Sequence, residues 1–164
     1  MKSLIVSILV VSICFLSTDI DTIRDSYKEA VEDKTKIKAF NNLVASVTKE
    51  DSANLIAYKG LSITLLAKLE PDIRSKKELF VDGVSYIEYA IKKSPNNIEA
   101  RFLRLTIQEN TPKILKYKKN IEEDKLFVLK QYKNIRSTAL KNYIKEYILQ
   151  SKGFTDNEKL IVKE

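Results

Sequence analysis

Hydrophobic residues recur at helical spacing along nearly the whole chain after Ile20. They return every three or four positions, as in the stripe Ile20, Ile23 and Tyr27, which places them on one face of a helix. No run alternates apolar and polar residues in the way that a half-buried strand does. Because an amphipathic helix cannot bury its apolar face alone, this spacing predicts an all-α fold in which helices pack against helices.

Prolines and capping residues divide the chain into seven or eight short helices. Pro71 and Pro95 interrupt the periodicity and end the helices before them, whereas Pro112 is expected in the first turn of a new helix. Side-chain N-caps are expected at Ser75, Asn97, Ser137 and Thr155. The short connections imply antiparallel neighbours, so residues 18–164 are predicted to form a single domain of helical hairpins, stacked as a bundle or a short superhelix.

The residue types present exclude several kinds of site. The chain has no histidine, so it has neither a histidine-dependent triad nor a histidine-ligated metal. Its single cysteine excludes an intrachain disulfide and a thiolate-rich zinc site, and its three glycines are too dispersed for a phosphate-binding loop. We expect no cofactor and no enzymatic activity. A carboxylate-dependent hydrolase is the least favoured alternative, since paired carboxylates need no histidine.

Residues 1–17 are predicted to be a signal peptide. Lys2 precedes an apolar run over residues 4–16, which is shorter than the about 20 residues that span a bilayer. The expected location is therefore outside the cytoplasm, either periplasmic or secreted. Two alternatives stay open: a lipid anchor on Cys14, although Ile13 stands where a lipobox has a small residue, and an uncleaved membrane anchor.

The net charge of +7 is unevenly distributed. Residues 19–110 contain 15 basic and 15 acidic residues, whereas residues 111–164 contain 13 basic and 7 acidic ones. The densest basic cluster consists of Lys113, Lys116, Tyr117, Lys118 and Lys119. It is either a face for an anionic partner or the solvated surface of an ordinary helix. Nucleic acid is disfavoured as that partner, because lysine predominates over arginine and an export signal is predicted.

Arg101 and Arg104 lie three residues apart and therefore on one side of a predicted helix. They are candidates for clamping a carboxylate or phosphate of a partner, since a guanidinium binds such groups through two hydrogen bonds. The favoured interpretation is an internal ion pair with Glu99, Glu88 or Asp124. The acidic triplet 122–124 is expected to be a solvated face with one member paired to an arginine.

Residues 53–110 resemble the helical hairpins of the tetratricopeptide repeat family. Gly60 matches the small residue of a first helix, Gly83, Ile87 and Ala90 match the pattern of a second helix, and Pro95 begins a segment like the joint between repeats. The connection over residues 69–77 is longer than in a regular repeat. The resemblance implies a stack of hairpins whose concave surface binds peptides or partner proteins.

The whole chain also resembles small exported bacterial helical proteins, from which no activity can be carried over. The resulting hypothesis is an exported, non-catalytic protein-interaction or scaffold module with no small-molecule substrate. The alternative is a protein that binds the cell envelope or another anionic surface through its basic C-terminal third.

Overall fold

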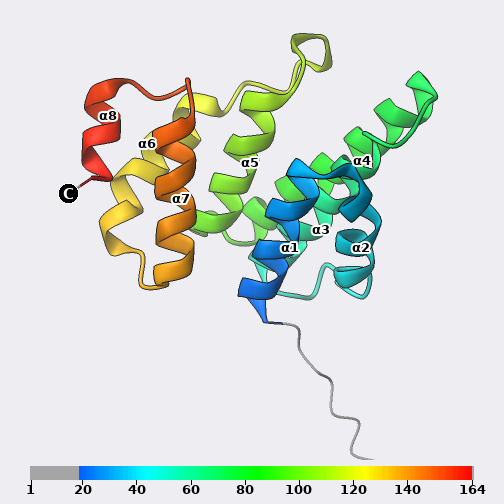
Figure 1. The fold of residues 1–164 in the computed structure, drawn as a ribbon, viewed down its shortest axis with the longest axis horizontal. Coiled ribbons are helices and arrows are strands. Elements are labelled where there is room, and N and C mark those ends of the chain that lie inside the picture. Colours follow the sequence, from blue (N-terminus) through cyan, green and yellow to red (C-terminus); the bar gives the residue numbers. More distant parts are fainter. Residues whose placement is uncertain (1–18, 164) are drawn as a thin grey trace, which may run out of the picture.

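The computed structural model describes residues 19–163 and contains eight α-helices and no strand within that range (Figure 1). The all-α prediction is therefore confirmed. The helices are α1 (Ile20–Glu32), α2 (Ile37–Leu43), α3 (Ala53–Leu66), α4 (Ile73–Lys93), α5 (Ile98–Asn110), α6 (Ile121–Gln131), α7 (Thr138–Gln150) and α8 (Asp156–Ile161). The predicted signal peptide lies outside the described residues. Within them, no helix combines the length and the apolar character that crossing a bilayer requires.

Three of the four predicted N-caps are confirmed. Asn97 accepts a hydrogen bond from the backbone N–H of Ala100, Ser137 caps α7 in the same way, and Thr155 forms a reciprocal capping box with Glu158. Each of these bonds spans only three residues. Local sequence is therefore enough to specify them.

The predicted cap at Ser75 is wrong, because α4 begins at Ile73 and Ser75 already lies in its first turn. Asp72 caps this helix, and its carboxylate accepts from both the backbone N–H and the hydroxyl of Ser75, at 2.7 and 2.9 Å. A carboxylate is a charged acceptor facing the positive end of the helix, so it competes successfully with a serine hydroxyl. Glu78, the expected partner of Ser75, pairs instead with Arg74.

The prediction that a helix begins at Pro112 is also wrong. After Pro112 the chain makes a 3₁₀ turn, Lys113–Leu115, and α6 begins only at Ile121. Lys116 has a left-handed backbone conformation with φ of 51°, which interrupts a right-handed helix. We call residues 112–120 the basic loop.

Helix α3 lies at the centre of the N-terminal half and packs against α1, α2, α4 and α5. Its most extensive contact is with α4, where Gly60 and Gly83 bring the two backbones together. A Cβ atom on Gly83 would lie 2.6 Å from the carbonyl oxygen of Gly60, closer than side chains are found. The two glycines therefore mark a close helix crossing.

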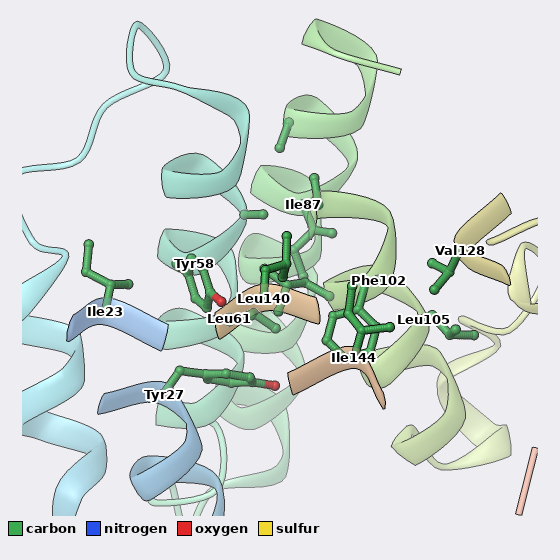
Figure 2. Packing of buried hydrophobic residues seen from close by; sticks show 14 of the residues in the cluster. Ile23, Tyr27, Tyr58, Leu61, Ile87, Phe102, Leu105, Val128, Leu140 and Ile144 are labelled. Atoms are coloured by element: carbon green, nitrogen blue, oxygen red, sulfur yellow. The ribbon is translucent and has the colours of Figure 1, made fainter. Parts of the chain in front are cut away.

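A continuous hydrophobic cluster links the two ends of the molecule (Figure 2). Near α1, the ring of Tyr27 contacts those of Phe40 and Tyr58, with centroids 5.6 and 5.8 Å apart. Farther along, Phe102 of α5 packs edge-on against Tyr143 and Tyr147 of α7. Helix α5 thus joins the α1–α4 group to the α6–α8 group, as Figure 1 shows.

Candidate functional site

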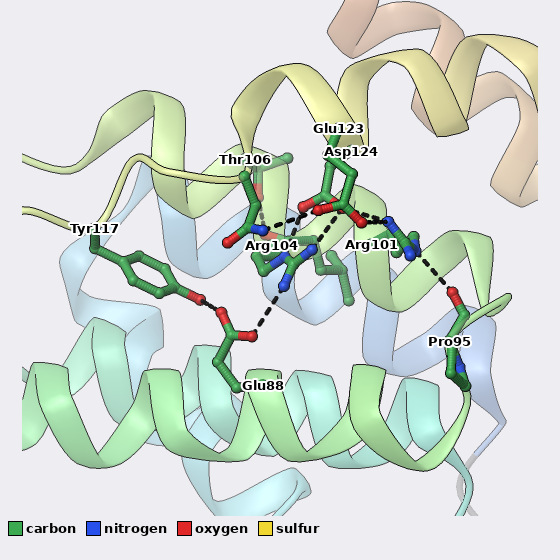
Figure 3. Close-up of polar contacts among 10 residues, drawn as sticks. Glu88, Pro95, Arg101, Arg104, Thr106, Tyr117, Glu123 and Asp124 are labelled. Carbon is green, nitrogen blue, oxygen red and sulfur yellow. Dashed lines mark hydrogen bonds and ion pairs between the residues drawn. The ribbon is translucent and has the colours of Figure 1, made fainter.

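Arg104 lies at the junction of α4, α5 and α6 and makes ion pairs with two carboxylates (Figure 3). Its Nε and Nη2 atoms donate to the two oxygens of Asp124 at 2.6 and 2.8 Å, and Nη1 donates to Glu88 at 2.9 Å. Asp124 is fully buried. Burial lowers the pKa of Arg104, but the hydrogen bonds and charge of Asp124 outweigh that effect and raise it above the usual arginine value.

Arg101 extends the same network along α5. Its Nη1 atom donates to Glu123 at 2.8 Å and to Asp124 at 3.1 Å, and its Nε atom donates to the carbonyl oxygen of Pro95 at 2.7 Å. Its guanidinium also lies over the ring of Phe127. The hydrogen bond from Arg101 is the main cause of a lowered pKa at Glu123. Both arginines therefore take part in internal ion pairs, as the favoured interpretation predicted.

Glu99 is not a partner of either arginine, contrary to one of the predicted pairings. It is buried and binds Arg24 of α1, whose Nε and Nη2 atoms donate to it at 3.0 and 2.8 Å. The hydroxyl of Tyr58 donates to the same carboxylate oxygen at 2.8 Å. This group of buried polar side chains was not predicted from the sequence. Its signal was the placement of Arg24 on the same helix face as Ile20 and Tyr27, where a charged residue needs a buried partner.

The basic loop is attached to the helices at two consecutive residues. The hydroxyl of Tyr117 donates to Glu88 at 2.7 Å, and its ring packs edge-on against Phe80. The ammonium group of Lys118 donates to the backbone carbonyl of Glu109 at 3.1 Å. Burial, followed by the hydrogen bond to Glu88, raises the pKa of Tyr117 well above its usual value. Tyr117 therefore stays a neutral donor at neutral pH.

The other lysines of the basic loop point outward. Lys113, Lys116 and Lys119 are exposed, and no hydrogen bond or ion pair joins their ammonium groups to any other residue in the range 19–163. Ile114, between the first two, is 85% exposed. The structure thus divides the predicted basic cluster. Tyr117 and Lys118 hold the loop, and three lysines carry uncompensated charge on a loop instead of on the predicted helix surface.

The two regions differ in what they offer chemically. In the arginine network, Glu88, Glu123 and Asp124 each accept from arginine, so its charges are compensated internally. No group of acidic or other ligating residues in the described part of the chain is arranged to hold a metal ion. The network is therefore a structural element that positions the basic loop, and the exposed lysines are the candidate binding site.

Comparison with known proteins finds no significant match to a family model, a curated protein or a solved structure. The tetratricopeptide-like arrangement of the hairpins stays a prediction.

Proposed function

We propose that the protein binds an anionic surface through Lys113, Lys116 and Lys119 of the basic loop. The supporting observation is that these three ammonium groups are exposed and unpaired among the described residues, whereas Arg101 and Arg104 nearby are compensated by carboxylates. Like charges that share a loop without counter-charges create a positive potential that attracts anions.

The strength of this attraction can be estimated. A lysine next to an anionic lipid surface contributes about 1 kcal/mol, so the three lysines together contribute about a hundredfold in affinity. Salt weakens the attraction because it shortens the distance over which charges act. The anchors at Tyr117 and Lys118 also help, since a loop already held in place loses less conformational freedom on binding.

The test compares binding of the full chain to vesicles of phosphatidylglycerol with binding to vesicles of phosphatidylcholine. Replacing Lys113, Lys116 and Lys119 with glutamine should lower the preference for the anionic vesicles by about a hundredfold at low salt. The matched control replaces Lys130, Lys152 and Lys163 with glutamine; these lysines are also exposed and lie in the same basic third of the chain. Equal losses in the two triple variants would contradict a site in the basic loop.

A second candidate is a protein-interaction module, and the outer face of α4 favours it. A shallow hollow on this face is lined by Arg74, Lys77, Glu78, Val81, Asp82 and Ser85. Val81 is 53% exposed, and the surrounding charges have both signs, which suits a protein partner better than a uniformly anionic surface. A photo-reactive residue at Val81 should then cross-link one discrete partner in the producing cells, and the same residue at Leu160 should not. Export and the absence of catalysis stay predictions.

A further inference from the structure

Two isoleucines are the most exposed large hydrophobic residues in the range 19–163. Ile114 is 85% exposed and Ile73 is 82% exposed. They belong to segments far apart in the sequence, the basic loop and the first turn of α4. In Figure 1 these two segments project from the same edge of the molecule, at the top of the view.

The local structure points Ile114 away from the protein. Leu115 is half-buried, while Tyr117 and Lys118 bind Glu88 and the backbone of Glu109. The inward positions of the basic loop are therefore already filled. A single exposed isoleucine is common on protein surfaces. These two, however, lie on projections at the same edge of the molecule, so one external surface would contact both.

Basic residues accompany both isoleucines. Lys113 and Lys116 flank Ile114, and the exposed Lys76 and Lys77 follow Ile73 within one turn of α4. Three acidic residues also lie near Ile73, and only Glu78 is paired with a cation. Asp72 accepts from Ser75, Glu78 pairs with Arg74, and Glu70 accepts from the backbone N–H of Asp72. Both projections therefore combine an apolar tip with lysines that have no ion pair among the described residues. At Ile73 the carboxylates of Glu70 and Asp72 also keep their negative charge, because their partners are neutral groups.

We infer that the anionic surface is a lipid bilayer and that Ile114 and Ile73 insert into it while the neighbouring lysines contact the headgroups. This inference rests on the proposed function and adds the chemical class of the partner. Membrane binding of this kind gains from both buried apolar area and attraction to anionic lipids. An acidic polysaccharide offers the charge but no apolar layer to receive the isoleucines. Two insertion points would also fix the orientation of the protein on the membrane.

The chain contains no tryptophan, so a single introduced tryptophan reports its own surroundings by fluorescence. We propose the variants Ile114→Trp and Ile73→Trp, with Leu160→Trp as the control, because Leu160 is 53% exposed and lies on α8 at the far end of the molecule. Vesicles of phosphatidylglycerol and phosphatidylcholine in equal amounts should shift the emission at positions 114 and 73 to shorter wavelength and protect both from a soluble quencher. The control should not shift. Bound protein without a shift at position 114 would overturn the inference, and a shift at position 114 alone would overturn the two-point orientation.

A second pair of measurements separates this inference from the proposed function. Replacing both Ile114 and Ile73 with serine should weaken binding to the same vesicles by about tenfold or more and leave binding to heparin, a soluble acidic polysaccharide, unchanged. Because both side chains are exposed, folding should not be affected, which thermal unfolding would verify. Unchanged vesicle binding in this variant would overturn membrane insertion while leaving the proposed function intact. If replacing the three lysines of the basic loop also changed neither vesicle nor heparin binding, the proposed function itself would be wrong.

Discussion

Hairpins α3–α4 and α5–α6 are held together by different interactions. In the first, Gly60 and Gly83 allow the two backbones to touch, and no ion pair joins the two helices among the described residues. In the second, the fully buried Asp124 of α6 binds Arg104 and Arg101 of α5. The first contact depends on the absence of side-chain atoms, and the second depends on the presence of opposite charges.

The two hairpins also differ in the segment that connects their helices. Six residues, 67–72, connect α3 to α4, whereas ten residues, 111–120, connect α5 to α6. The longer connection includes the basic loop, and Glu88 accepts from both Arg104 and Tyr117. The charge network that joins the helices therefore also fixes the loop, while the glycine contact serves packing alone. Substitutions that remove a charge from the network, or add side-chain atoms at the glycine contact, should distinguish the two kinds of helix contact.

The largest effect is expected from Asp124→Asn. The substitution keeps the shape of the side chain but leaves Arg104 buried with one carboxylate instead of two, and breaking such a pair costs about 3–5 kcal/mol of unfolding free energy. Urea unfolding measures the loss. Glu146→Gln is the control, because this exposed carboxylate on α7 has no ion-pair partner among the described residues; it should change stability by less than about 0.5 kcal/mol. A loss below about 1 kcal/mol for Asp124→Asn would mean that the network is not needed for stability.

Gly83→Leu tests the other hairpin by adding atoms. The new side chain would meet the carbonyl oxygen of Gly60 and the backbone of Thr64, so we expect a loss of about 1–3 kcal/mol through overpacking. Val81→Leu, on an exposed face of the same helix, should be nearly neutral. Thermal unfolding of both variants gives the comparison, and a neutral Gly83→Leu would show that α3 and α4 are not in close contact there.

Tyr117→Phe removes the hydrogen bond between the basic loop and Glu88 without changing the ring that packs on Phe80. The expected loss is about 1 kcal/mol, because Glu88 is partly exposed and regains water. Hydrogen exchange should also become faster in residues 112–120. If exchange in this segment were unchanged, the hydrogen bond would not be what holds the loop.

The same hydrogen bond predicts a dependence on alkaline pH. The pKa of Tyr117 is higher in the folded state than the value of about 10 in an unfolded chain, so folding favours the neutral phenol. The stabilisation is complete below pH 10 and decreases as the pH rises, by about 1 kcal/mol between pH 10 and 11 for this one group. Tyr58, Tyr143 and Tyr147 also have raised pKa values, so the prediction concerns the difference between wild type and Tyr117→Phe in urea unfolding. Identical pH profiles would contradict it.

The smallest effect on stability is expected from replacing Lys113, Lys116 and Lys119 with glutamine. These side chains have no partner among the described residues, so the unfolding free energy should change by less than about 0.5 kcal/mol. A larger loss, measured by urea unfolding, would show that the lysines serve the fold, and the case for a binding surface would weaken.

Features that depend on nearby residues were predicted correctly. The caps at Asn97, Ser137 and Thr155 involve atoms three residues apart, and the helical spacing that begins at Ile20 and Ile23 is a property of each segment. The internal pairing of Arg104 was also anticipated from its charge and position, although its partners Glu88 and Asp124 lie 16 and 20 residues away. The cap at Ser75 failed because Asp72 is the stronger competitor.

Apart from the pairing of Arg104 with Glu88 and Asp124, the features that depend on distant residues were predicted poorly. The helix expected from Pro112 is absent because Tyr117 and Lys118 bind Glu88 and Glu109, which belong to other helices. Glu99 was assigned to its own helix neighbours, but its partner Arg24 is 75 positions away in the sequence. The separation of inward and outward residues in the basic loop follows from these same long-range bonds.

By itself, the sequence determined that this chain is helical, where most of its helices begin, and where its positive charge is concentrated. Those properties follow from side-chain periodicity, local capping and composition, none of which needs a second segment. Only the tertiary structure decided which charges are compensated and which face outward, because a counter-charge acts through distance in space and not through position in the chain. As a result, the side chains of Lys113, Lys116 and Lys119 have no partner within residues 19–163, whereas Asp124 is buried against Arg101 and Arg104.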